Sequence, residues 1–88
     1  MTYPQVPSDA VILEIARMHD AMVGARRIAA AIGGGLWITT VRHIKQLVNL
    51  ADYLRVDRLE LIRDNLEHSR DAAHARMHEP RRSLREVA

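Results

Sequence analysis

Residues 31–47 read AIGGGLWITTVRHIKQL and contain the only run of consecutive glycines in the chain. An alanine-rich apolar segment leads into Gly33–Gly35, and an amphipathic segment without acidic residues follows them. Consecutive glycines make it costly for a helix to continue. The stretch therefore predicts that one helix ends at the glycines and that another begins after them.

The chain before the glycines predicts an arm and two helices. Residues 1–7 contain two prolines, which favour an extended arm. Ser8 is a favourable N-cap for a first helix over 9–22, and Gly24 is the expected stop. A short second helix is expected over 25–32, where apolar residues recur at helical spacing.

A third helix is expected to begin near Ile38, with Thr39 or Thr40 as its N-cap. Its apolar residues recur every three or four positions and form one stripe: Val41, Ile44, Leu47, Val48, Ala51 and Leu54. The opposite stripe is polar: Thr39, Arg42, His43, Gln46 and Asn49.

A further helix start lies at Asp57, because Glu60 follows it at the spacing of a capping box. We therefore expect a break near 55–57 and a C-terminal helix over 57–78, with one unbroken helix as the alternative. Residues 79–88 are expected to form a basic, flexible tail.

The order of a packing helix, a second helix, a glycine turn and a third helix is the layout of a helix-turn-helix unit. The residues that match this pattern lie within 26–47: Ile28-Ala29, Ile32-Gly33, Thr40-Val41, Ile44 and Leu47. On these residues the chain resembles helix-turn-helix DNA-binding proteins, and its IGGGL turn loosely resembles that of the Trp-repressor type. Val41 follows Gly33 at a greater distance than in the usual unit, which predicts either a longer turn or that Gly35 takes the place of the usual glycine.

Helical spacing and this resemblance together predict an all-α fold. It is a small four-helix domain with a helix-turn-helix core over 8–55 and a long C-terminal helix over 57–78. The C-terminal helix carries a seam of apolar residues that could form a homodimer or bind a protein partner. The alternative is that this seam packs against the first and third helices of the same chain.

The charges are unevenly distributed along the sequence, although the net charge is only +2. Residues 24–50 carry Arg26, Arg27, Arg42 and Lys45 and no acidic residue, whereas the segments on either side are acidic overall. Such segregation is typical of a protein with a polyanionic partner.

The polar side chains around the turn are of the types that DNA-binding proteins use to contact bases and phosphates. If the third helix enters a major groove, Arg42 can bind a guanine edge, and Gln46 and Asn49 can bind adenine. The other candidates are assigned to phosphates or base edges: Arg26, Arg27, Thr39, Thr40, His43 and Lys45. The hypothesis is a sequence-specific transcriptional regulator, a repressor that binds double-stranded DNA as a homodimer.

A second hypothesis uses the same basic face differently. A small helical adaptor, inhibitor or antitoxin could bind an acidic protein partner through it. We expect no enzymatic activity and no cofactor, because no catalytic arrangement stands out in the 88 residues. No metal site is expected either, since His74 and His78 form only a two-ligand pair. The chain lacks cysteine, a signal pattern and a membrane-length apolar run, so a cytoplasmic location is expected.

Overall fold

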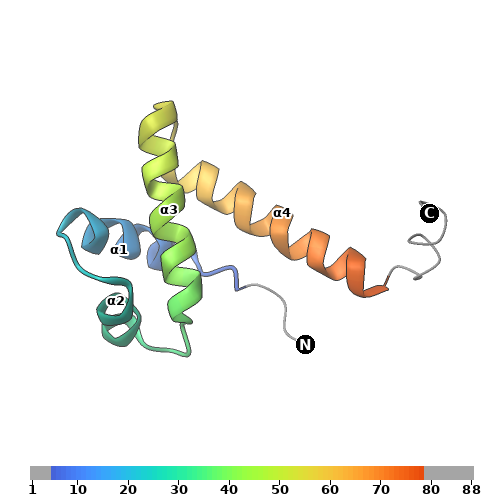
Figure 1. The fold of residues 1–88 in the computed structure, drawn as a ribbon, viewed down its shortest axis with the longest axis horizontal. Coiled ribbons are helices and arrows are strands. Elements are labelled where there is room, and N and C mark those ends of the chain that lie inside the picture. Colours follow the sequence, from blue (N-terminus) through green and yellow to red (C-terminus); the bar gives the residue numbers. More distant parts are fainter. Residues whose placement is uncertain (1–4, 79–88) are drawn as a thin grey trace, which may run out of the picture.

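The computed structural model describes residues 5–78 of the chain, and the side chains of residues 5–72. It contains four helices: α1 (Asp9–Asp20), α2 (Ala25–Ile32), α3 (Ile38–Leu54) and α4 (Arg58–His78). The expected all-α, four-helix architecture is confirmed (Figure 1). Residues 1–4 of the expected arm and the expected tail 79–88 lie outside the described residues.

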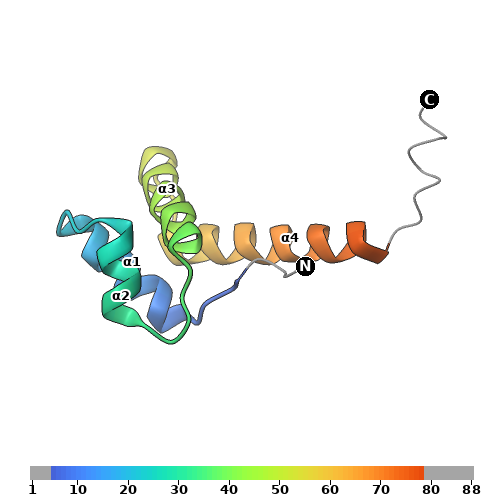
Figure 2. The ribbon, with the colours of Figure 1, turned by 60° about the horizontal axis from the view of Figure 1, so that its bottom comes forward.

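Helix α3 lies at the centre of the fold, because it packs against each of the other three helices. Helices α1 and α2 cover one side of α3, and α4 crosses it on the other (Figure 1). A second view shows that α4 extends well beyond the other helices (Figure 2). Within the part of the chain that the structure describes, no helix is both long and apolar enough to cross a membrane.

The core is built from aliphatic side chains of all four helices, and α3 supplies the largest share: Ile12, Ile15, Ala16, Ile28, Ala29, Val41, Ile44, Leu47, Val48, Ile62 and Leu66. The apolar stripe expected on α3 is buried as far as Ala51, but Leu54 is 52% exposed. Leu54 is the last residue of α3, and Ala51 is the last of its buried residues. Ile62 and Leu66 of the α4 seam are buried within the chain.

Two helix ends depend on residues with a left-handed backbone. Helix α1 ends at Asp20, two residues earlier than expected, and the chain turns through Met22 at φ 66°. There the Val23 N–H donates to the Met18 carbonyl, as in a Schellman motif. Gly24 is therefore not the stop that the sequence predicted; it is the N-cap of α2. Helix α3 ends by the same motif, with Arg55 at φ 58°.

The expected glycine turn and the expected break before α4 are both present. Gly33, Gly34 and Gly35 have φ values of 70°, 64° and 79°, which residues with a side chain rarely adopt. At the start of α4, an Asp57 carboxylate oxygen accepts a hydrogen bond from the Glu60 N–H at 2.8 Å. This bond matches the cap predicted from the spacing of the two residues.

The start of α3 is capped by a distant residue. Its N-cap is Trp37, which makes no side-chain capping bond, so the prediction of Thr39 or Thr40 as the cap was wrong. Instead, Oε1 of Gln5 accepts hydrogen bonds from the Trp37 N–H at 2.9 Å and from the Thr40 hydroxyl at 3.1 Å. Nε2 of Gln5 donates to the Gly35 carbonyl at 2.9 Å. The residues before α1 thus fix both the glycine turn and the first turn of α3.

We expect Gln5→Ala to lower the free energy of unfolding by about 1–3 kcal/mol, because it leaves the buried Thr40 hydroxyl without its acceptor. Urea denaturation followed by circular dichroism measures this loss. Gln46→Ala is the matched control, since Gln46 is exposed on α3 and should change stability by less than about 0.5 kcal/mol. Equal effects of the two substitutions would contradict the capping role.

A second pair of variants tests the glycine turn. Gly33→Ala should cost about 1–3 kcal/mol, because Gly33 combines φ 70° with ψ −148°, a region that is essentially glycine-only. Gly24→Ala makes the same chemical change at φ −73°, where alanine fits without strain, and should change stability by no more than about 1 kcal/mol. Neither added methyl group meets another atom within 4 Å, so thermal unfolding of the two variants compares backbone conformation alone.

Candidate nucleic-acid interface

Helix α2 presents two arginines because its opposite side is buried. Ile28 and Ala29 point into the core, at 0% and 7% exposure. Arg26 and Arg27 precede them in the first turn of the helix, and both are exposed. The burial of the short apolar side of α2 therefore fixes where these two positive charges lie.

Helix α3 presents a polar stripe for the same reason. Its aliphatic side packs into the core, so Thr39, Arg42 and Gln46 lie on the exposed side. The spacing of three and four residues places their side chains in one row along the helix. This row contains the residue that was expected to read guanine and one of the two expected to read adenine.

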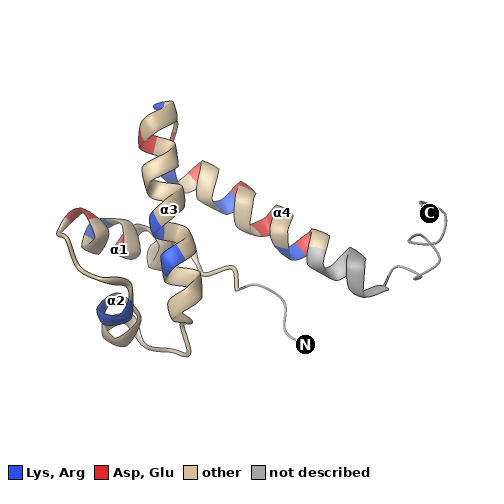
Figure 3. Cartoon of the chain, in the orientation of Figure 1, with Lys and Arg blue, Asp and Glu red and all other residues tan. Residues whose placement is uncertain are grey.

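The arginines of the two helices meet at one shallow hollow of about 810 Å³, which we call the basic hollow. Arg26, Arg27 and Arg42 line it together with small or apolar residues of the α1–α2 turn and of α2: Ala21, Met22, Val23, Gly24, Ala25 and Ala30. No acidic residue lines it. Figure 3 shows the same distribution, with blue but no red on α2 and on the N-terminal half of α3.

No carboxylate among the described side chains neutralises the three arginines of the basic hollow. None of the ion pairs formed among residues 5–72 involves Arg26, Arg27 or Arg42. Their charges are therefore available to an anionic partner.

Four other residues that the sequence assigned to the interface bind within the protein. Thr40 is only 7% exposed and donates to Gln5, so we remove it from the candidate interface. Nζ of Lys45 donates to the Val23 carbonyl at 2.9 Å and holds the α1–α2 turn against α3. Nε2 of His43 hydrogen-bonds Oδ1 of Asn65 on α4 at 3.1 Å.

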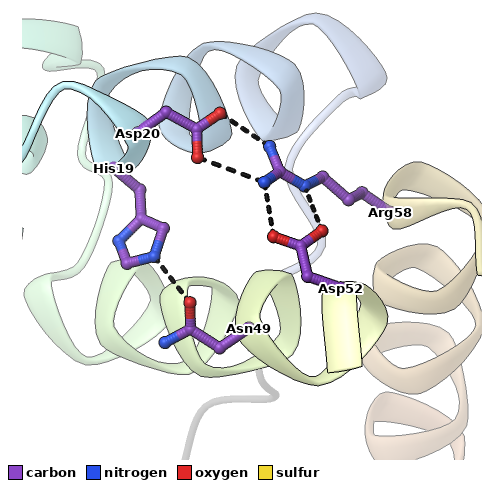
Figure 4. Close-up of polar contacts among 5 residues, drawn as sticks. All are labelled: His19, Asp20, Asn49, Asp52 and Arg58. Atoms are coloured by element: carbon purple, nitrogen blue, oxygen red, sulfur yellow. Dashed lines mark hydrogen bonds and ion pairs between the residues drawn. The ribbon is translucent and has the colours of Figure 1, made fainter. Parts of the chain in front are cut away.

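The fourth residue, Asn49, accepts a hydrogen bond from Nε2 of His19 at 2.9 Å, which links α3 to α1 (Figure 4). The structure thus brings Arg26, Arg27, Thr39, Arg42 and Gln46 to one exposed region. His43, Lys45 and Asn49 serve mainly as links between elements.

The acidic residues that border the basic segment in the sequence are both held by one arginine. Arg58, at the start of α4, binds Asp20 at the end of α1 at 2.7 Å and Asp52 near the end of α3 at 2.6 Å (Figure 4). It contacts both oxygens of each carboxylate. These bonds tie three helices together and partly neutralise the carboxylates nearest in sequence to the arginines of α2 and α3.

Hydrogen bonds from Arg58 are the main cause that lowers the pKa of Asp20 and of Asp52 below the ordinary value of 3.8. The attraction of the guanidinium charge adds to this lowering of both pKa values, and the partners in turn raise the pKa of Arg58. Because folding lowers these carboxyl pKa values, the resulting stability is present above pH 3.8 and is lost as the pH falls below it.

We therefore expect the midpoint of thermal unfolding to fall as the pH is lowered from about 5 to about 3, and the fall to be smaller in Arg58→Gln. At neutral pH the midpoint temperature of this variant should lie a few degrees below that of the wild type, as expected for an exposed charge network. Circular dichroism at a series of pH values measures both effects. The unfolding midpoint should still fall with pH in both proteins, because Arg17 also lowers the pKa of Glu14.

Arg70→Gln is the matched control for this experiment, because Arg70 lies further along α4 and pairs only loosely with its neighbour Asp71, at 3.4 Å. If Arg58→Gln and Arg70→Gln show the same dependence on pH, the three-helix role of Arg58 is refuted.

The described side chains hold no candidate metal centre. Among residues 5–72, no group of three or more histidine or acidic side chains could hold a metal ion. The His74 and His78 pair lies outside the described side chains. Comparisons with protein-family models, with curated proteins and with solved structures gave no match to this chain.

Proposed function

We propose that this protein is a sequence-specific DNA-binding transcriptional regulator, a repressor that contacts double-stranded DNA through α2 and α3. The observation that supports this most strongly is the basic hollow: three exposed arginines from two helices meet there, without an acidic residue in its lining. Such a surface suits a DNA backbone, because neutralising phosphates supplies a large share of the affinity of DNA-binding proteins.

In this proposal, Arg26 and Arg27 bind backbone phosphates. Both lie in the first turn of α2, whose N-cap Gly24 makes no side-chain capping bond. The first N–H groups of α2 therefore remain open to a phosphate oxygen, and the helix dipole favours a negative charge at this end. These contacts would orient the protein on DNA without reading its sequence.

The exposed row on α3 supplies the base contacts of the proposal. Arg42 can donate two hydrogen bonds to a guanine edge, and Gln46, one turn later, can pair with adenine. Thr39 at the start of the row can contact a phosphate or a base edge. The buried side of α3 holds these residues in one orientation, so the helix that contacts the bases is already folded before DNA binds.

We include dimerisation and a cytoplasmic location in the proposal. The Ile62 and Leu66 part of the α4 seam cannot serve as the dimer contact, because both side chains are already buried in the core. A homodimer would use other side chains, and light scattering coupled to size-exclusion chromatography measures whether it forms.

One observation favours the second candidate function, an adaptor, inhibitor or antitoxin that binds an acidic protein. Met22 is 91% exposed and lines the basic hollow together with Val23, Ala25 and Ala30. This apolar lining suits a protein segment that carries both carboxylates and apolar side chains. A DNA backbone would leave the apolar lining of the hollow unused.

Fluorescence anisotropy with labelled duplex DNA, using a site selected from random sequences and an unrelated duplex, tests the first function. Arg26→Ala and Arg27→Ala should weaken binding to both duplexes and reduce the salt slope by about 1 each. Arg42→Ala should cost about 1–3 kcal/mol on the selected site and much less on the unrelated duplex.

Arg70→Ala serves as the control, since it removes the same charge from α4, away from the basic hollow. Equal effects of all four substitutions on both duplexes would show that binding is not localised to α2 and α3. Absence of binding at low salt would exclude the DNA function and favour an acidic protein partner.

A further inference from the structure

A second hollow of about 700 Å³ lies at the start of α4, and we call it the α4 groove. Val56 and Leu61 provide its apolar lining, and Asp57, Glu60 and Asp64 add three carboxylates. Val56 is 47% exposed, so part of this apolar lining is open to solvent. The groove therefore combines an apolar surface with a negative charge.

The carboxylates of the α4 groove form no ion pair with any of the described side chains. None of the ion pairs among residues 5–72 involves Asp57, Glu60 or Asp64, although Asp57 also caps α4. Other acidic residues of the same domain are paired, as Asp20 and Asp52 are with Arg58. Within residues 5–72, the groove therefore carries negative charge that no arginine or lysine neutralises.

The chain that leads into the groove is also apolar and uncovered. Leu50, Tyr53 and Leu54 lie in the last turns of α3, directly before Val56, and are 42%, 84% and 52% exposed. Four of the seven large apolar side chains that are exposed in the described part of the chain fall between residues 50 and 56. Of these four residues only Val56 lines the α4 groove, and the other three add exposed apolar surface to the segment that leads into it.

We propose that the α4 groove binds a basic amphipathic segment of a partner protein. Apolar side chains of that segment would contact Val56 and Leu61, and its lysine or arginine side chains would pair with Glu60 and Asp64. Charge complementarity selects this occupant, because the carboxylates repel nucleic acid. A second copy of the chain, placed by a two-fold axis, would bring the same acidic rims close to one another.

This surface is independent of the proposed DNA function. The α4 groove and the basic hollow share no lining residue, and their charges are opposite. The protein could therefore hold an anionic and a cationic partner at the same time. Variants of one surface should leave the other unaffected.

Nuclear magnetic resonance of the full ¹⁵N-labelled chain tests the proposal with a synthetic probe. The probe is a leucine–lysine peptide of about 14 residues, which forms about four helical turns with one apolar side. We expect it to shift the amide signals of residues 56–68, whereas a leucine–glutamate peptide of the same pattern should leave them unchanged.

Two variants of the groove and a matched control sharpen the result. Asp64→Lys should weaken binding of the leucine–lysine peptide about fivefold, because it replaces an attraction with a repulsion. Asp71→Lys makes the same change two turns later on the same side of α4, outside the groove lining, and should have little effect. Val56→Ser should weaken binding without changing the charge. Circular dichroism confirms that each variant is folded.

The proposal is overturned if the amides of residues 56–68 do not respond to the leucine–lysine peptide, or if Asp71→Lys weakens binding as much as Asp64→Lys. It is also overturned if those amides shift with protein concentration alone while the molar mass doubles, since a second copy then covers the groove. Arg42 does not line the α4 groove, so Arg42→Ala should leave the affinity for the peptide unchanged. Peptide binding and DNA binding can therefore fail or succeed independently of each other.

Discussion

The burial of one aliphatic side of α3 is the constraint on which the rest of the structure depends. Val41, Ile44 and Val48 are 0% exposed, and helices α1, α2 and α4 all pack against the helix that carries them. Because these side chains are fixed in the core, the opposite side of α3 is also fixed, with Arg42 and Gln46 exposed. One packing interaction therefore sets both the stability of the domain and the orientation of its candidate interface.

Local patterns in the sequence predicted most of the helices, because the period of the apolar residues and the Asp57 cap are local signals. The first helix end was missed because Met22, rather than a glycine, adopts the left-handed conformation. The role of Thr40 was missed for a different reason: its partner Gln5 lies 35 residues away, and no short-range pattern reveals it. For the same reason, the His19–Asn49 bond was not foreseen, although the exposed arginines were.

The charged residues of the domain fall into two groups: some form ion pairs with one another, and others have no ion-pair partner among the described side chains. Arg58 gathers the carboxylates of Asp20 and Asp52, so these acidic residues stabilise the junction of three helices. Arg26, Arg27 and Arg42 have no such partner among the described residues and meet at the basic hollow. A net charge of only +2 thus conceals two surfaces of opposite sign, which is why the distribution is more informative than the total.

The remote cap at Gln5 also constrains the order in which the domain assembles. A helix normally acquires its cap from an adjacent residue, so its first turn can form as soon as the chain is made. Here the Trp37 N–H receives its acceptor only after a loop of more than 30 residues has closed. The first turn of α3 should therefore remain frayed until late in folding and exchange its amide protons faster than the middle of the helix.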